Sequence, residues 1–154
     1  MFKMFFNKKK EDIFAPVNGQ IIKLENVNDP VFSSKAMGDG FGIEPEENHI
    51  YSPIIGKVIS VFPTKHAILL ETKKGQSVLV HIGIDTVELN GQGIDVHVAE
   101  GQKVSEETLL ATVDLPFILE QGKQTTVIVA FEDIASIELI NNNHVKVHEK
   151  LGDL

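Results

Sequence analysis

The stretch FPTKHAILLETKKGQSVLVHIGIDTVELNGQG, residues 62–93, decides the fold of this chain. Two short runs of apolar, β-favouring residues, at 67–70 and 78–82, lie on either side of a Gly-containing turn sequence at 73–76. This pattern is typical of a β-hairpin. We expect a turn of two or four residues, and either length pairs the strands in the same register. The sequence therefore predicts two adjacent antiparallel strands.

The expected register has His66 facing Gly83 and His81 facing Ile68. Both imidazoles then project from one face of the sheet as diagonal neighbours, about 7–8 Å apart at the backbone. Thr64 lies two residues before His66, so on a strand its hydroxyl shares that face and can bond an imidazole nitrogen. A three-residue turn would place the two histidines on opposite faces, because it shifts the register by one residue. The predicted histidine pair thus depends on the turn length.

The rest of the chain shows the same alternation of short Val/Ile/Leu-rich runs with Gly, Asn and Pro turn signals. This pattern predicts an all-β protein, an antiparallel β-sandwich or barrel with a few short helical turns. We expect the helical turns near 33–37, 115–121 and 134–140, the second with Asp114 as its cap. Residues 13–154 are long enough to form a single domain with its own core.

Residues 1–12 are expected to form a flexible tail. Two interpretations of this tail stay open. It is either a frayed terminus or an amphipathic segment, in which Phe2, Phe5 and Phe6 enter an anionic membrane surface and Lys8–Lys10 meet the lipid headgroups. The apolar run is too short for a secretory signal, and no later stretch is long enough to span a bilayer, so we expect a cytoplasmic protein.

Composition excludes several classes of protein. The formal net charge is −8 and the chain has no dominant basic stripe, which argues against nucleic acid as a partner. The chain has no Cys, so disulfides, Cys-ligated zinc and thiol nucleophiles are excluded. All 14 basic residues are Lys, so any phosphate must be met by His, Lys, Thr or backbone N–H groups.

The chemistry of the histidine pair leaves three interpretations open. A neutral imidazole can accept a phosphoryl group while its neighbour donates to the phosphoryl oxygens. Two histidines with an acidic neighbour can bind zinc. The pair can also be structural. The other histidines, 49, 97, 144 and 148, are expected to be structural or surface residues, and alternating Val145 and Val147 favour a strand at the C-terminus rather than a helical metal site.

The motifs at 62–66 and 78–93 closely resemble the glucose-type enzyme IIA of the bacterial phosphoenolpyruvate-dependent sugar phosphotransferase system, and the similarity extends over residues 15–115. The resemblance implies an antiparallel β-sandwich that relays a phosphoryl group from phospho-HPr to a cysteine on the IIB domain of a sugar permease. It implies no cofactor, although the paired histidines can share zinc with a partner's carboxylate. Because the chain lacks Cys, no IIB domain is expected within it.

The resemblance also implies roles for individual residues. His81 would be phosphorylated through Nε2, His66 would hydrogen bond the phosphoryl group, and Thr64 would orient His66. Two acidic residues would flank the site and hold a basic partner surface, and an apolar patch would dock the partner. The acidic residues are Asp29 and Asp85, and the patch is Val31, Phe32, Phe62, Leu79 and Val87.

The C-terminal third departs from the family pattern at 106–107 and 131–133, and we expect the chain to stop short of a final strand. These departures leave open which permease is served: glucose, N-acetylglucosamine, a β-glucoside or another sugar. They also leave open a IIA-like regulator that binds partners without relaying phosphate.

Two further alternatives are weaker. A lysostaphin-like zinc endopeptidase would use the His81-x-x-x-Asp85 motif but also needs a His-x-His motif, which the chain lacks. A biotinyl or lipoyl carrier domain would need a Met-Lys-Met tip, for which Lys35-Ala36-Met37 is a poor substitute.

Overall fold

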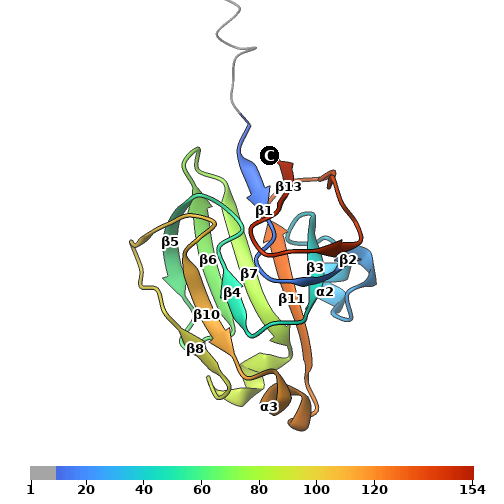
Figure 1. The fold of residues 1–154 in the computed structure, drawn as a ribbon, viewed down its shortest axis with the longest axis vertical. Helices are drawn as coiled ribbons and strands as arrows, with labels where there is room; N and C mark the ends of the chain where they lie inside the picture. The colour runs from blue at the N-terminus through green and yellow to red at the C-terminus, as the bar shows by residue number, and fades with distance from the viewer. Residues whose placement is uncertain (1–9) are drawn as a thin grey trace, which may run out of the picture.

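The computed structural model describes residues 10–154, which form a sandwich of antiparallel sheets (Figure 1). The large sheet has eight strands in the order β12-β2-β3-β11-β7-β6-β5-β9, a three-stranded sheet has the order β4-β10-β8, and β1 pairs with β13. Within residues 10–154 none of the three sheets closes into a barrel, so the sandwich is confirmed and the barrel alternative is wrong. The strands are β1 Asp12–Phe14, β2 Gly19–Lys23, β3 Gly40–Pro45, β4 His49–Tyr51, β5 Gly56–Val61, β6 Ala67–Thr72, β7 Ser77–Ile84, β8 Ile94–Val96, β9 Lys103–Val104, β10 Leu109–Val113, β11 Gln124–Phe131, β12 His144–Val145 and β13 Lys150–Asp153.

The main core lies between the sheets and follows the two-residue alternation of the strands. On β7, Val78, Val80 and Ile82 point into this core and are at most 1% exposed. Full burial of such a side chain contributes about 1.5–3 kcal/mol to stability. Leu79 and His81 therefore point to the outer face of the large sheet.

A second, smaller core covers part of that outer face. It lies beneath two short helical segments, the 3₁₀ helix η1 Leu24–Asn26 and the α-helix α2 Pro30–Ser33. Its buried residues are Leu24, Val27, Phe32, Ala67, Leu79, Ile84, Ile128 and Ala130. These segments cover the outer face only in part. His81 is partly exposed and lies beside Phe32 of α2.

Of the three predicted helical turns, one is confirmed, one is displaced and one is wrong. α2 begins at Pro30, a little before the predicted 33–37, because Asp29 caps it. α3, Leu115–Glu120, lies where the sequence predicts it, with Asp114 as its cap. The third, 134–140, is neither helix nor strand. There the backbone bonds to Asp39, whose Oδ2 accepts from Ile137 N at 2.7 Å and whose N donates to the Ile134 carbonyl at 2.7 Å.

The predicted register of the β6–β7 hairpin is wrong by one residue. Ala67, and not Ile68, faces His81. The loop has three residues, Lys73–Gly75, and Gly75 takes a left-handed φ of 94°. A three-residue loop that ends on a left-handed Gly is a common hairpin type and sets this register.

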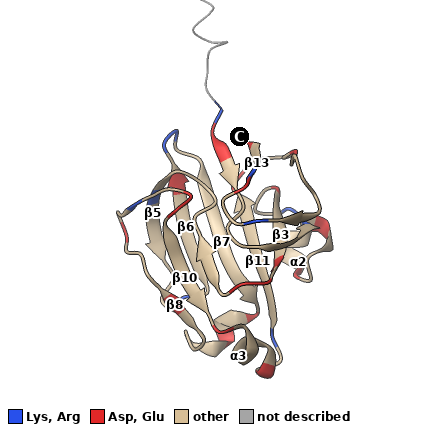
Figure 2. Cartoon of the chain, viewed as in Figure 1, with Lys and Arg blue, Asp and Glu red and all other residues tan. Residues whose placement is uncertain are grey.

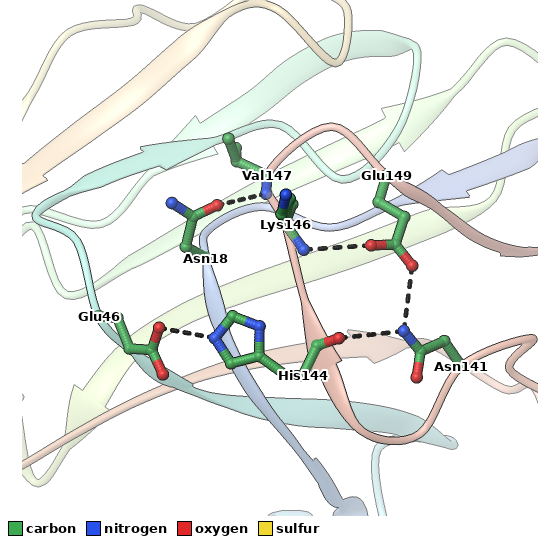
Figure 3. Close-up of polar contacts among 7 residues, drawn as sticks. All are labelled: Asn18, Glu46, Asn141, His144, Lys146, Val147 and Glu149. Carbon is green, nitrogen blue, oxygen red and sulfur yellow. Dashed lines mark hydrogen bonds and ion pairs between the residues drawn. The ribbon is translucent and has the colours of Figure 1, made fainter.

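The C-terminal segment is held against the N-terminal strands by polar contacts (Figure 3). Asn18 Oδ1 accepts from Val147 N at 2.7 Å, and Glu149 accepts from Lys146 N and from Asn141 Nδ2. The bond from Asn141, followed by that from Lys146, lowers the pKa of Glu149. His144 lies in β12 and its Nε2 lies 2.6 Å from Glu46 Oε1. The strand predicted at this end is present at Val145 but does not reach Val147.

The two ends of the described chain pair with each other: β1 at the N-terminal end lies antiparallel to β13 at the C-terminal end (Figure 1). The expectation that the chain stops short of a final strand is therefore wrong. Glu11 and Asp12, which the sequence places in the tail, contact the domain: Glu11 accepts from the Thr72 hydroxyl at 2.7 Å, and Asp12 opens β1. The expected membrane-binding segment, residues 1–10, lies almost wholly outside the described residues. Over residues 10–154, no helix has the length and apolar character needed to cross a bilayer.

Candidate functional site

His81 lies on the outer face of β7, between Ala67 on β6 and Ile128 on β11. Its Nδ1 is 2.7 Å from the carbonyl oxygen of Gly83. A carbonyl oxygen can only accept a hydrogen bond, so the proton of the neutral ring lies on Nδ1. The other nitrogen, Nε2, is then unprotonated and keeps a free lone pair.

His66 lies beside this ring although the hairpin register would separate them. It precedes the first regular pair of β6, on a bend where Lys65 adopts a left-handed φ of 62°. The strand alternation does not extend through this bend, so the His66 ring packs against His81 with centroids 5.1 Å apart and planes at 82°. The pairing of the histidines is confirmed, but a bend produces it and not the predicted register.

Thr64 contacts His66 as predicted, across the same bend and not along a strand. Its Oγ1 lies 2.6 Å from His66 Nδ1. The bend is closed by two backbone bonds, from Lys65 N to the Phe62 carbonyl at 2.7 Å and from Phe62 N to the Ala67 carbonyl at 3.0 Å. The imidazole of His66 is thereby held at one nitrogen while its other nitrogen is left for a ligand.

Four rings form a row through the site. Phe62 meets His66 at a centroid distance of 5.6 Å, His66 meets His81, and His81 meets Phe32 at 5.0 Å. All three contacts are edge-to-face, the geometry that ring quadrupoles favour. The two phenyl rings thus confine the imidazoles from both ends and limit their rotation.

Burial keeps both imidazoles neutral. It lowers the pKa of His66, which is only 8% exposed. It also lowers the pKa of His81 to about 4, with a further contribution from His66, while the Gly83 carbonyl, Asp29 and Asp85 act in the opposite direction. At neutral pH His81 is therefore an uncharged nucleophile with two carboxylates nearby that favour positive charge on its ring.

The two acidic residues are placed by short helical segments. Asp29 Oδ1 accepts from Val31 N at 2.9 Å and from Phe32 N at 3.3 Å, which caps α2 and presents Phe32 to His81. Asp85 has a left-handed φ of 62° and precedes the 3₁₀ helix η2, Thr86–Leu89.

The charge of the molecule is unevenly distributed. Acidic residues outnumber basic ones 22 to 14. Figure 2 shows acidic segments around α3, at the end of the molecule opposite the lysines of the hairpin tip.

The predicted docking patch divides into two groups. Val31, Phe62 and Val87 are 52%, 37% and 47% exposed, so they are available to a partner. Phe32 and Leu79 are 5% and 8% exposed and belong to the smaller core. Phe32 contacts the His81 ring, Leu79 packs in the same smaller core, and both offer little surface for docking.

Sequence reasoning missed two residues of this site. Gly83 acts through its backbone carbonyl, which no side-chain motif reveals. Thr86 is buried behind Gly83, and its hydroxyl donates to the Ile82 carbonyl four residues earlier. A Thr placed four residues after a strand residue can make such a local bond, so its position was the available signal.

The described residues 10–154 contain no group of three or more His, Asp or Glu side chains arranged to hold a metal ion. The zinc endopeptidase interpretation requires such a group, so nothing in this part of the chain supports it.

Comparisons with known proteins find relatives over most of the chain. Residues 11–137 match the family model for the phosphoenolpyruvate-dependent sugar phosphotransferase system, EIIA 1. The glucose-specific EIIA component of Staphylococcus aureus (strain Mu50) is 44% identical over 153 residues, covering 94% of this chain and 92% of the relative. The glucose-specific EIICBA component of Streptococcus pneumoniae serotype 4 is 47% identical over 135 residues, which is 88% of this chain but 19% of that protein.

The solved structure of glucose permease IIA from Mycoplasma capricolum has the same fold. It superposes with a TM-score of 0.89 at 35% identity, covering 95% of this chain and 96% of that one.

Proposed function

Because this chain belongs to the EIIA 1 family of the phosphoenolpyruvate-dependent sugar phosphotransferase system, and is a phosphoryl relay component of that system, we propose that His81 carries the phosphoryl group on Nε2. One observation supports this assignment above the others. The bond from His81 Nδ1 to the Gly83 carbonyl leaves Nε2 as the nitrogen with a free lone pair.

The acceptor step conserves atoms and electrons. The P–N bond to the histidine of phospho-HPr breaks as the lone pair of His81 Nε2 forms a new P–N bond. The departing imidazole of HPr keeps the electron pair, and His81 keeps its proton on Nδ1. The ring thereby gains positive charge, and the carboxylates of Asp29 and Asp85, which raise the pKa of His81, stabilise that charge.

His66 assists this step without becoming phosphorylated. The Thr64 hydroxyl lies 2.6 Å from Nδ1 and can donate to it, and the proton of neutral His66 then lies on Nε2. That N–H can donate to a phosphoryl oxygen and stabilise charge that develops there during transfer. Thr64 then holds the ring of His66 in the orientation that presents Nε2 to the phosphoryl group.

The partner surface combines charge with exposed apolar side chains. We assign Val31, Phe62 and Val87 to direct docking and Asp29 and Asp85 to a basic partner surface. The partners are phospho-HPr as donor and the IIB domain of a permease as acceptor, where a cysteine thiolate attacks the phosphorus and the imidazole of His81 leaves with the electron pair of the broken P–N bond. The relatives are glucose-specific by name, so glucose is the sugar that we propose.

We propose that the relay itself uses no cofactor and takes place in the cytoplasm, where phospho-HPr and the permease's IIB domain are found. The imidazoles of His66 and His81 are two of the side chains that zinc prefers, and a partner's carboxylate would supply a further ligand. A zinc ion would then strengthen a partner complex and would not take part in transfer.

Phosphorylation with purified enzyme I, HPr and radiolabelled phosphoenolpyruvate tests this function. The wild-type chain should take up one acid-labile, base-stable phosphoryl group, and His81→Ala should take up none. His66→Gln should accept label but pass it slowly to a IIB domain, and His97→Ala, which removes an imidazole outside the site, should behave as wild type. No label on the wild-type chain would contradict the relay and favour a IIA-like regulator.

A further inference from the structure

Thr86 is a buried polar residue directly behind the histidine pair. It is 1% exposed and opens η2. Its hydroxyl donates to the Ile82 carbonyl at 2.5 Å. Its methyl group fills the space beside Gly83, because a β-carbon on Gly83 would overlap that methyl. Thr86 therefore contacts both residues of the Ile82-Gly83 backbone unit.

The backbone of Ile82 and Gly83 also makes hydrogen bonds to both histidines. Ile82 N donates to the His66 carbonyl at 2.7 Å, and the Gly83 carbonyl accepts from His81 Nδ1 at 2.7 Å. The Gly83 backbone has a left-handed φ of 78° and no side chain of its own to fix it. The direction of its carbonyl therefore depends on what packs around it.

Resting on the proposed function, we propose that Thr86 is a positioning residue for phosphoryl transfer. Its hydroxyl and methyl hold the Ile82-Gly83 unit so that the Gly83 carbonyl fixes the proton of His81 on Nδ1. The lone pair of Nε2 then faces the incoming phosphoryl group. Thr86 touches neither substrate nor phosphorus, and it acts on His81 only through the backbone of Ile82 and Gly83.

The burial of Thr86 makes its hydroxyl hard to replace. At 1% exposure, water cannot take the place of the hydroxyl without entering the core. Asp85, with its left-handed φ of 62°, turns the chain back so that residue 86 can reach residue 82. Loss of the hydroxyl should leave the Gly83 carbonyl free to swing, and His81 would then sample the tautomer with its proton on Nε2.

Two variants separate the hydroxyl from the shape of the side chain. Thr86→Val keeps the volume and removes the hydroxyl, and Thr86→Ser keeps the hydroxyl and removes the methyl. In protein labelled with ¹⁵N-histidine, NMR distinguishes a protonated ring nitrogen from an unprotonated one. Wild type and Thr86→Ser should show His81 protonated on Nδ1, and Thr86→Val should show a mixture of tautomers.

The transfer rate is the second readout. We expect Thr86→Val to lower the initial rate of labelling from phospho-HPr about fivefold, as the loss of one hydrogen bond would. Thr86→Ser should keep most of the rate, and both variants should still reach one phosphoryl group per chain. If circular dichroism shows that Thr86→Val is unfolded, Thr86→Ala compared with Thr86→Ser isolates the same hydroxyl.

A wild-type tautomer signal and wild-type rate in Thr86→Val would overturn the inference. Equal rate losses in both variants without a change of tautomer would also overturn it, because they indicate a purely structural role. An unlabelled wild-type chain would contradict the proposed function instead, and the tautomer comparison would still decide whether Thr86 positions His81.

Discussion

The ring of Phe32 meets the ring of His81 edge to face, with centroids 5.0 Å apart. Phe32 reaches this position from α2, a helix of four residues that is too short to form without tertiary support. Its support is the side chain of Asp29, which accepts from two backbone N–H groups. One carboxylate therefore both shapes the wall of the site and adds negative charge beside His81.

These two roles of Asp29 can be separated by substitution. Asp29→Asn keeps an oxygen that can cap α2 but removes the charge, so stability should change little while the pKa of His81 falls further below its present value of about 4. Asp29→Ala loses the cap as well and should cost about 1 kcal/mol of stability. Urea unfolding and an NMR titration of His81 measure the two effects. Equal stability losses in both variants would show that the cap bonds contribute nothing.

The pKa of His81 predicts how stability depends on pH. The unfolded chain binds a proton at this residue as pH falls through about 6.5, but the folded chain binds it only near pH 4. The unfolded state thus holds more protons between these values, and the free energy of unfolding should fall as pH falls from 6.5 to 4. For His81 alone the loss is roughly 3 kcal/mol at full extent.

The variant His81→Gln isolates this contribution. It lacks the titrating group, so its stability should depend less on pH than that of the wild type across the same interval. Urea unfolding of both chains at pH 7 and pH 4.5 gives the difference, and His97→Gln serves as the control for removing an exposed imidazole. Parallel curves for wild type and His81→Gln would show that burial does not depress this pKa.

Gly83 should tolerate no side chain. An added β-carbon would overlap the Thr86 methyl, lie 2.9 Å from the Gln124 carbonyl oxygen and strain a backbone with φ 78°. The matched control is Gly75, which also has a positive φ, 94°, but has nothing within 4 Å of an added β-carbon. Gly75→Ala should cost about 1–2 kcal/mol from strain alone, and Gly83→Ala clearly more.

Chemical denaturation measures both costs, and phosphorylation distinguishes the two sites. Gly83→Ala should also slow labelling of His81, since its carbonyl must move, whereas Gly75→Ala should label as wild type. Equal costs in the two variants would mean that the space around Gly83 can adjust.

The residue types of the site could be predicted from sequence better than its geometry. The apolar run at 78–82 predicted a strand there, and in the structure its alternation buries Val78, Val80 and Ile82 and leaves His81 on the other face. The pairing partner depends on the loop, and Lys73–Gly75 can form turns of different length with little change in sequence signal. The register was therefore the part most open to error.

The two groups that act through the backbone were beyond sequence reasoning for another reason. The bend at Lys65 and the carbonyl of Gly83 are set by left-handed backbone conformations, and only the packed structure fixes which residues adopt them. The division of the docking patch into exposed and buried residues also depends on the packed structure. Phe32 and Val31 are neighbours in the chain, and the direction in which α2 faces decides that one is buried and the other exposed.

The wrongly predicted helix at 134–140 leads to a last prediction, about Asp39. Ile134, Ile137 and Leu139 pack against the main core, and the three-residue spacing of Ile134 and Ile137 is that of an apolar helix face. The backbone instead runs irregularly because the buried carboxylate of Asp39 accepts from Ile137 N, while Lys35 lies 3.5 Å from its other oxygen. A buried charge with these partners is costly to remove alone.

Asp39→Ala should leave the Ile137 N–H without its partner and cost about 1–3 kcal/mol. Asp39→Asn keeps an acceptor for Ile137 and loses only the ion pair with the half-exposed Lys35, so its cost should be smaller. Hydrogen exchange at the Ile137 amide should accelerate in Asp39→Ala more than in Asp39→Asn. Since this anchor lies outside the row of rings around His81, labelling by phospho-HPr should stay at the wild-type rate in both. Unchanged exchange at Ile137 in Asp39→Ala would show that core packing alone holds the segment.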